Sequence, residues 1–183
     1  MTEKKLFIFS APSGCGKTSL AQALIAKRAD IAVAVSHTTR AMRAGEAHGV
    51  DYFYVDKNAF KQKIADNGFL EHAQVFDNFY GTSVDAVNAL IAEGKHVILD
   101  IDWQGARQVR KLFPDVVSIF IVPPSVQALE ERLCGRGLDD AATIARRMEG
   151  ALAELSHQDE YDHKIINDDF DTALNELDIL FGA

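Results

Sequence analysis

The chain has 183 residues, of which 48% are apolar and 25% are charged, and its formal net charge is −8. A folded chain of this length buries about 70% of its extended surface, so one core domain needs no disulfide or metal to hold it together. The acidic balance argues against loose nucleic-acid binding, which depends on many Lys and Arg side chains contacting phosphates.

Cysteine usage and hydropathy indicate the compartment. The two cysteines, Cys15 and Cys134, are not spaced as metal ligands. The N-terminal apolar run ends at Phe9, too early for an export segment. The apolar stretch at 116–124 is too short to cross a bilayer, which takes about 20 residues. We therefore expect a soluble, cytoplasmic protein without membrane contacts.

The first elements form a strand, loop and helix. An apolar run at 6–10 is typical of a buried strand, and a helical pattern covers about 17–28. A second strand is predicted at 31–35. The amino-acid composition then changes over 36–83, where arginines, glycines and aromatic residues are more frequent. This change indicates an inserted subdomain over that range.

Alternating strands and helices resume after the insert. Helices are predicted at 84–92, 104–112, 125–133 and 141–155, strands at 96–101, 116–122 and 164–166, and Asp171 is expected to cap a closing helix. This alternation predicts an α/β fold with a parallel sheet flanked by helices. We expect a core at 4–35 and 84–183, a mixed or antiparallel insert at 36–83, and a short lid at 133–146.

The segment Ala11-Pro-Ser-Gly-Cys-Gly-Lys-Thr18 follows the first strand and opens the first helix, as a phosphate-binding P-loop does. Gly14 and Gly16 let backbone N–H groups turn toward an anion, and the helix adds its positive end. Lys17 supplies a charge for the β- and γ-phosphates, and Thr18 an oxygen for Mg²⁺. Ala11 stands where the strict pattern has Gly, and it can close the turn if its φ is negative.

Cys15 lies inside this loop, close to a lysine and to a helix N-terminus. Both neighbours favour a thiolate, so we expect alkylation of Cys15 to block ATP sterically. Catalysis itself does not need the thiol.

Carboxylates follow a later apolar strand. The predicted strand at 96–101 is followed closely by Asp102 and contains Asp100 near its end. Such carboxylates help to hold Mg²⁺ beside a P-loop, but an Asp after a strand is also a common helix cap. Because the same chain contains a P-loop, we favour the interpretation that these carboxylates help to hold Mg²⁺.

Two groups of arginines suit phosphate binding. Arg40 and Arg43 lie three residues apart beside hydroxyl side chains, and guanidinium groups bind phosphate through paired, charge-assisted hydrogen bonds. A solvated basic loop is the alternative. A second group flanks two glycines that would permit a lid, unless it is simply an exposed helix face; it consists of Arg132, Arg136, Arg146 and Arg147.

These features together suit transfer of a phosphoryl group to an acceptor that is itself a phosphate. Such an acceptor is already ionised near neutral pH, so it needs little help from a general base. Catalysis is then mainly alignment of two polyanions and neutralisation of their charge.

In combination, the motifs resemble the guanylate kinase family over nearly the whole chain. The ordered matches include Val35-Ser-His-Thr-Thr-Arg40, Gly45-Glu-Ala-His-Gly-Val-Asp-Tyr52, Phe69-Leu-Glu71, Tyr80-Gly-Thr-Ser83, Ile98-Leu-Asp-Ile-Asp-Trp-Gln-Gly105 and Asn167-Asp-Asp169. The resemblance implies a P-loop kinase that transfers the γ-phosphoryl of ATP to GMP, and also to dGMP, with Mg²⁺ as cofactor. It further implies a monomer or weak homo-oligomer.

The resemblance also implies roles for individual residues. ATP would be bound by Ala11, Pro12, Ser13, Gly14, Cys15, Gly16, Lys17 and Thr18. The GMP phosphate would be held by Arg40, Arg43, Tyr52 and Tyr80, and the guanine read by Ser36, Glu71, Thr82 and Asp102. The catalytic set would be Lys17, Arg40, Arg132, Arg136 and Arg147, with Thr18 and Asp100 on the Mg²⁺ side.

Two other functions compete with this one. A non-catalytic interaction module of the same fold would be expected to lack Lys17 or the loop glycines, which are present here. A kinase for another phosphorylated small molecule is disfavoured by Glu71 and Ser36. A carboxylate can accept from N1–H and the amino group of guanine, whereas adenine would present it with an unmatched acceptor at N1.

Overall fold

The computed structural model describes residues 5–135 and 141–182. The chain divides into two compact units, one containing residues up to Ile8 with Asp30–Val117, the other containing Phe9–Ala29 with residues from Ser118 onward. Part of the predicted lid at 133–146 lies outside the described residues. No helix within the described ranges is both long enough and apolar enough to cross a membrane.

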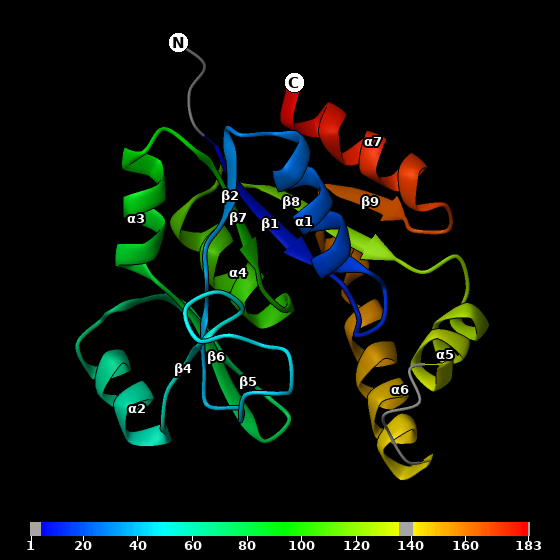
Figure 1. Ribbon diagram of the computed structural model, residues 1–183, viewed down its shortest axis with the longest axis horizontal. Coiled ribbons are helices and arrows are strands. Elements are labelled where there is room, and N and C mark those ends of the chain that lie inside the picture. The colour runs from blue at the N-terminus through cyan, green and yellow to red at the C-terminus, as the bar shows by residue number, and fades with distance from the viewer. Residues whose placement is uncertain (1–4, 136–140, 183) are drawn as a thin grey trace. The chain divides into compact units, whose positions relative to one another are not determined.

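The larger sheet has five strands in the order β2-β7-β1-β8-β9 (Figure 1). They are β1 (Leu6–Ser10), β2 (Ile31–Val33), β7 (His96–Asp100), β8 (Val117–Val122) and β9 (His163–Ile166). β2 pairs with β7, and β8 with β9, in parallel. Side chains on these strands, such as Ile8, Leu99 and Phe120, are fully buried, as expected when both faces of a parallel sheet are covered. The predicted α/β class is confirmed.

Helices α1 (Lys17–Lys27) and α7 (Phe170–Gly182) lie side by side in the second unit (Figure 1). Asp178 joins them, because its carboxylate pairs with Lys27 at 2.7 Å and with Arg28 at 3.2 Å. The prediction that Asp171 caps the closing helix is wrong. The cap is Asp169, whose carboxylate accepts a hydrogen bond from the Thr172 N–H at 2.8 Å.

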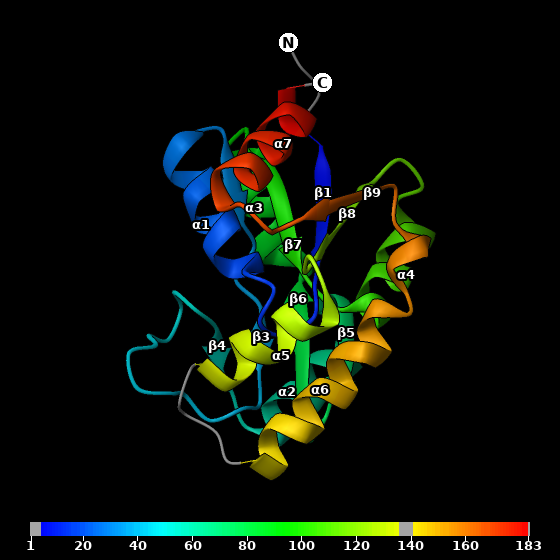
Figure 2. The ribbon, with the colours of Figure 1, turned by 90° about the vertical axis from the view of Figure 1, so that its right-hand side faces the viewer.

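The same unit contains two further helices and a short turn of 3₁₀ helix. α5 (Val126–Gly135) and α6 (Ala141–Leu155) are neighbours (Figure 2). A 3₁₀ turn, η1 (Gln158–Glu160), precedes β9. The predicted helix at 141–155 matches α6 at both ends.

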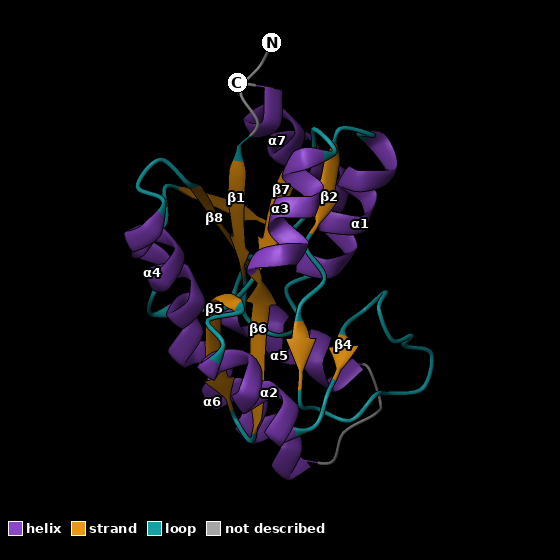
Figure 3. Ribbon diagram, turned by 90° about the vertical axis from the view of Figure 1, so that its left-hand side faces the viewer, coloured by secondary structure: helices purple, strands orange, loops and turns teal. Residues whose placement is uncertain are grey.

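The first unit carries a second, mixed sheet in the order β4-β3-β6-β5 (Figure 3). Its strands are β3 (His37–Thr38), β4 (Phe53–Tyr54), β5 (Phe69–Val75) and β6 (Asn78–Ser83). β3 pairs in parallel with β4, and β6 pairs in antiparallel fashion with both β3 and β5. The mixed character expected of the insert is confirmed, whereas its boundaries remain a prediction.

Three helices accompany this sheet: α2 (Lys57–Ala65), α3 (Val84–Ala92) and α4 (Trp103–Leu112). α4 lies beside β5. α2 was not predicted from the sequence. It begins where Asp56 accepts hydrogen bonds from the N–H groups of Asn58 and Ala59, both at 2.8 Å. α2 buries only Phe60, so it has no apolar periodicity.

Hydrogen bonds between Ser118 and Asp162 join the beginnings of β8 and β9. The Asp162 carboxylate accepts hydrogen bonds from the N–H and the hydroxyl of Ser118, at 2.8 and 2.7 Å. Ser118 Oγ in turn accepts from the Asp162 N–H at 3.2 Å. Ser118 is fully buried, so loss of the carboxylate leaves its donors without that partner.

We expect Asp162→Ala to lower the free energy of unfolding by about 1–3 kcal/mol, the usual cost of leaving buried polar groups unsatisfied. Urea titration followed by circular dichroism measures this. The matched control is Asp159→Ala, since Asp159 pairs with Lys164 at the surface and its side chain is 83% exposed. The control should change stability by less than about 0.5 kcal/mol, and equal losses in both variants would contradict the assignment.

Candidate functional site

The P-loop segment has the backbone geometry that its sequence predicts. Gly14 and Gly16 have φ angles of 93° and 82°, in the left-handed region that favours glycine. Gly16 is the N-cap of α1, and the Cys15 N–H closes a turn onto the Pro12 carbonyl at 3.2 Å. Among the described residues, only Asn67 and Phe76 have a positive φ without being glycine, so Ala11 meets the condition that the turn imposes.

Asn167, which directly follows β9, holds this loop through a hydrogen bond. It is buried, and its amide Nδ2 donates to the Cys15 carbonyl at 2.8 Å. A Cβ on Gly16 would lie 2.5 Å from the same nitrogen, so the glycine permits this close approach. Arg132 donates to the Asn167 carbonyl at 2.9 Å. Asn167 therefore connects the loop to one predicted lid arginine.

The other predicted ATP-side residues have varied surroundings. Lys17 and Thr18 are the first two residues of α1, with Lys17 partly buried and Thr18 exposed. Pro12 is buried and Ser13 is exposed. On α6, Arg147 is partly buried and Arg146 is exposed, while Arg136 lies outside the described residues.

Cys15 does not have the reactive thiolate that the sequence predicted. Its side chain is fully buried, whereas Cys134 is exposed. Burial raises the pKa of the Cys15 thiol to about 12, although Arg132 and Lys17 oppose this rise. Desolvation therefore raises the pKa of this thiol more than the nearby positive charges lower it.

Arg40 lies at the centre of the residues predicted to bind the GMP phosphate. Its guanidinium pairs with Glu46 at 2.7 Å and lies over the Tyr52 ring, 5.5 Å from the centroid. The rings of Tyr52 and Tyr80 are 5.9 Å apart. Three of the four predicted phosphate ligands thus gather together.

Glu46, for which the sequence predicted no role, joins the members of this group through hydrogen bonds. Its carboxylate accepts from Arg40, from the Arg43 N–H at 2.8 Å and from the Tyr54 hydroxyl at 2.8 Å. These bonds, that from Arg40 first, lower the pKa of Glu46 to about 2. The sequence does show a carboxylate close to arginines and tyrosines, which could have indicated such a role. The spacing of these residues along the chain, however, does not show which of them Glu46 contacts.

The predicted guanine-reading residues form a buried cluster. Ser36 Oγ and Thr82 Oγ1 are 3.0 Å apart, and the Thr82 N–H donates to Glu71 Oε1 at 2.8 Å. All three residues are at most 7% exposed. A polar cluster so enclosed is suited to matching hydrogen bonds on a flat base.

Burial affects the titration of Glu71 strongly. Desolvation raises the pKa of its carboxyl to about 7, with hydrogen bonds from Thr82 opposing the rise and the Asp102 charge adding to it. Glu71 therefore changes charge in the physiological range.

Asp102 caps α4 and also borders the cluster. Its Oδ1 accepts from the Gly105 N–H at 3.0 Å, and its Oδ2 accepts from Gln104 at 2.8 Å. The helix-cap interpretation of this carboxylate is thus correct, and a role toward guanine remains compatible with it because a carboxylate has about four acceptor positions. Asp100 ends β7 and is partly buried.

Mg²⁺ prefers oxygen ligands and is usually held through one or two protein groups together with substrate phosphates. The Thr18 hydroxyl and the Asp100 carboxylate are chemically suited to this. In the described part of the chain, no three His, Cys, Asp or Glu side chains cluster as a metal cage would require.

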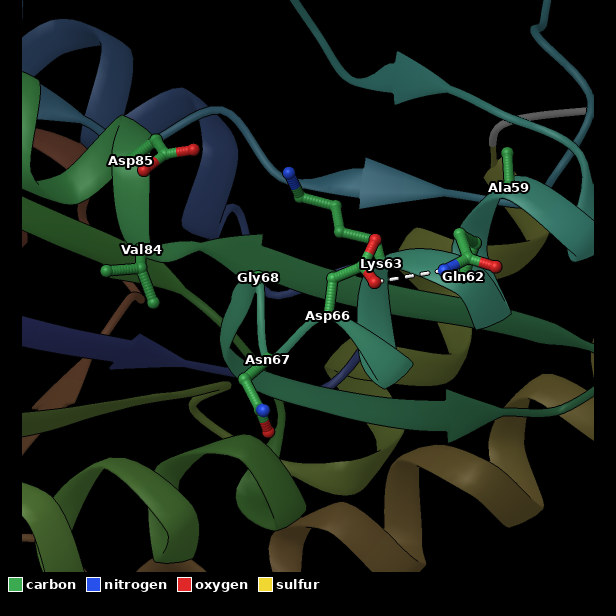
Figure 4. A pocket seen from close by; sticks show the side chains of 8 residues that line it. All are labelled: Ala59, Gln62, Lys63, Asp66, Asn67, Gly68, Val84 and Asp85. Atoms are coloured by element: carbon green, nitrogen blue, oxygen red, sulfur yellow. Dashed lines mark hydrogen bonds between the residues drawn. The ribbon is translucent and has the colours of Figure 1, made fainter.

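One hollow in the first unit does not coincide with these residues. It has a volume of about 620 Å³ and lies where α2 ends and α3 begins (Figure 4). Gln62 donates to Asp66 at its rim, at 2.9 Å. The hollow is wide and contains none of the predicted site residues; it is lined by Ala59, Gln62, Lys63, Asp66, Asn67, Gly68, Val84 and Asp85.

Comparisons with known proteins show which family the chain belongs to. The family model described as guanylate kinase matches residues 3–183. The guanylate kinase of Chromohalobacter salexigens is 62% identical over 178 residues, covering 97% of this chain and 83% of the relative. That of Escherichia coli K12 is 53% identical over 185 residues, covering 100% and 89%.

A solved structure agrees as well. The crystal structure of guanylate kinase from Anaplasma phagocytophilum superimposes with a TM-score of 0.81 at 34% identity, covering 98% of this chain and 85% of that one. With a P-loop in one unit, a buried carboxylate cluster in the other and matches along its whole length, the chain belongs to the guanylate kinase family.

Proposed function

We propose that this chain transfers the γ-phosphoryl group of ATP to GMP, and also to dGMP, giving ADP and the guanosine diphosphate. The observation that carries the proposal is the buried cluster of Ser36, Glu71 and Thr82, which occurs in a chain whose P-loop keeps Gly14, Gly16 and Lys17. Membership of the guanylate kinase family supports it. The core at 4–35 and 84–183 would bind ATP, and the insert at 36–83 would bind GMP.

The donor side relies on backbone and on charge. Backbone N–H groups of the loop at 11–18, in which only Pro12 lacks one, and the N-terminus of α1 would surround the ATP phosphates, and Lys17 would neutralise the β- and γ-phosphates. Arg132, Arg136 and Arg147 would balance charge on the transferred group. The link from Asn167 to the loop holds the backbone in place before ATP arrives, which reduces the entropy lost on binding.

The acceptor side holds the GMP phosphate and reads the base separately. Arg40, Arg43, Tyr52 and Tyr80 would bind the phosphate, and Glu46 already holds Arg40 in position. Ionised Glu71 would accept hydrogen bonds from N1–H and the amino group of guanine. The hydroxyl groups of Ser36 and Thr82 would form further hydrogen bonds to the base, and Asp102 would lie beside them. No proton needs to be removed from the acceptor, because a monophosphate is already ionised.

The Thr18 hydroxyl and the Asp100 carboxylate would each offer an oxygen ligand to Mg²⁺, which supplies charge neutralisation for phosphoryl transfer when it is bound. ATP and GMP are the partners that this function requires. A cytoplasmic location, a monomeric or weakly associating state and the absence of nucleic-acid binding remain predictions from the sequence.

The competing functions lack a supporting observation. A non-catalytic module would not require the two left-handed glycines and Lys17 to be kept. A kinase for another phosphorylated molecule would leave the buried carboxylate of Glu71 without its matching donors.

A coupled assay of ADP formation across nucleoside monophosphates tests the proposal. With ATP and Mg²⁺, GMP should be the best acceptor, ahead of AMP by a factor of about 10⁴, as in sites built around a polar match. Lys17→Ala should reduce kcat by at least about 100-fold, because it removes charge stabilisation from the transition state. Absence of GDP formation by the wild-type protein would refute the proposal.

Glu71 makes GMP binding dependent on pH. Because only the ionised carboxylate matches both donors, the Kd for GMP should rise about tenfold as the pH falls from 8 to 6, through the pKa of about 7. Glu71→Gln should weaken GMP binding by about 100-fold and remove this dependence. Calorimetric titration with GMP and, separately, with ATP measures both effects; parallel loss of the two affinities would contradict the role.

The same group affects stability without any ligand. Its pKa is higher in the folded than in the unfolded chain, so its contribution is complete at low pH and is lost as the pH rises through about 7. Glu71→Gln should therefore lose less stability than wild type between pH 6 and pH 8. Urea titrations at the two pH values make the comparison.

Burial of Cys15 predicts selective alkylation. Iodoacetamide at pH 7.5 should modify the exposed Cys134 in the native protein and leave Cys15 unmodified, because only the thiolate reacts. Urea should expose both thiols. Peptide mass spectrometry identifies the sites, and native modification of Cys15 at a rate similar to that of Cys134 would contradict the prediction.

A further inference from the structure

We propose that Gly105 is a specificity-determining position of this kinase, because its bare backbone leaves the space that the Glu71 carboxylate occupies when it reads the acceptor base. The inference rests on the proposed function and extends it to a residue outside the predicted site. Gly105 acts through Glu71, so it is a positioning residue.

The contact between the two residues is closer than any side chain permits. A Cβ on Gly105 would overlap Glu71 Oε2 and would lie 3.0 Å from Glu71 Cδ. Gly105 lies in the first turn of α4, and its φ is not positive. Alanine therefore suits its backbone, and in a helix alanine is more stable than glycine by about 0.5–1 kcal/mol. Space for Glu71, not backbone conformation, is the reason that glycine is needed.

The Glu71 side chain has little freedom to move aside. It is 3% exposed, and its other oxygen, Oε1, accepts from the Thr82 N–H at 2.8 Å. Thr82 is fully buried, and its hydroxyl contacts Ser36. A displaced carboxylate would lose this hydrogen bond or change the plane in which it faces the base.

α4 is equally held, because its glutamines bond to the backbone of the strand that carries Glu71. Gln108 accepts from the His72 N–H at 3.2 Å and donates to the His72 carbonyl at 2.8 Å. Gln104 donates to the Gln74 carbonyl at 3.1 Å. β5 is an edge strand of its sheet, so these amides bond where a further strand would. The helix cannot retreat without breaking them, and an added methyl group must move the carboxylate.

A moved carboxylate affects guanine more than adenine. Guanine presents two donors that need two oxygens in one plane, whereas adenine has no such pair to lose. Gly105→Ala should lower kcat/KM for GMP by about 100-fold, the typical effect of a 1 Å misplacement. The value for AMP and the KM for ATP should change by less than about threefold, so GMP/AMP discrimination falls by nearly the same factor as GMP use.

The control is Gly182→Ala, another helical glycine, where a Cβ would meet nothing within 4 Å. It should leave both acceptors unaffected. Thermal melts of both variants separate loss of fold from loss of positioning. The pH dependence of the Kd for GMP gives a further readout, because a displaced carboxyl no longer has the surroundings that raise its pKa.

A companion variant, Glu71→Asp, tests the contact directly. Aspartate is shorter by one methylene, so it makes room for the methyl group of Gly105→Ala. The double variant should lose much less GMP activity than the product of the two single losses, and it should fold even if Gly105→Ala alone does not.

The outcomes are distinct. Unchanged GMP activity in Gly105→Ala, or losses that simply multiply in the double variant, would overturn the inference while leaving the proposed function intact. A wild-type protein that forms no GDP would instead refute the proposed function itself.

Discussion

The proposed acceptor site depends on one buried carboxylate, that of Glu71. Placing Glu71 away from water is unfavourable for its charged form, and the rise of its pKa to about 7 reflects that cost. The Thr82 N–H offsets part of it, and the bare backbone at Gly105 provides the space for the second oxygen. The strand β5 and the helix α4 must then keep a fixed distance, which the Gln108 amide maintains. The arrangement of these elements follows from accommodating one acidic group.

The proposed donor site has a similar arrangement, formed by different residues. In both units a glycine lets a polar side chain approach the backbone closely, and an amide side chain bonds to main-chain groups. Asn167 does this for the loop at Cys15 and Gly16, as Gln108 does for β5 at His72. Amide side chains suit this use because they both donate and accept without carrying a charge that burial would penalise. The backbone beside the proposed phosphate and base sites is therefore held by neutral amide side chains.

Charged side chains gather at the residues proposed to hold the GMP phosphate. The chain as a whole carries −8, yet Arg40 is held among Glu46 and the Tyr52 and Tyr54 rings. An arginine held by a carboxylate and ring faces loses less side-chain entropy when phosphate binds. Glu46 stays ionised at neutral pH, since its pKa is about 2, so Arg40 keeps its partner throughout the range in which Glu71 titrates.

Local residue patterns were enough to predict the alternation of strands and helices, the phosphate loop and the family. These depend on local periodicity and on residue types at short spacing, which is why α3 and α6 have the predicted bounds. Tertiary structure decided the rest. It buried Cys15 and reversed the expected effect on its thiol, placed the cap of α7 at Asp169 instead of Asp171, and formed α2 around Phe60 alone. It also brought Gly105 against Glu71. Burial and contacts between distant residues depend on the path of the whole chain, and no local pattern encodes that path.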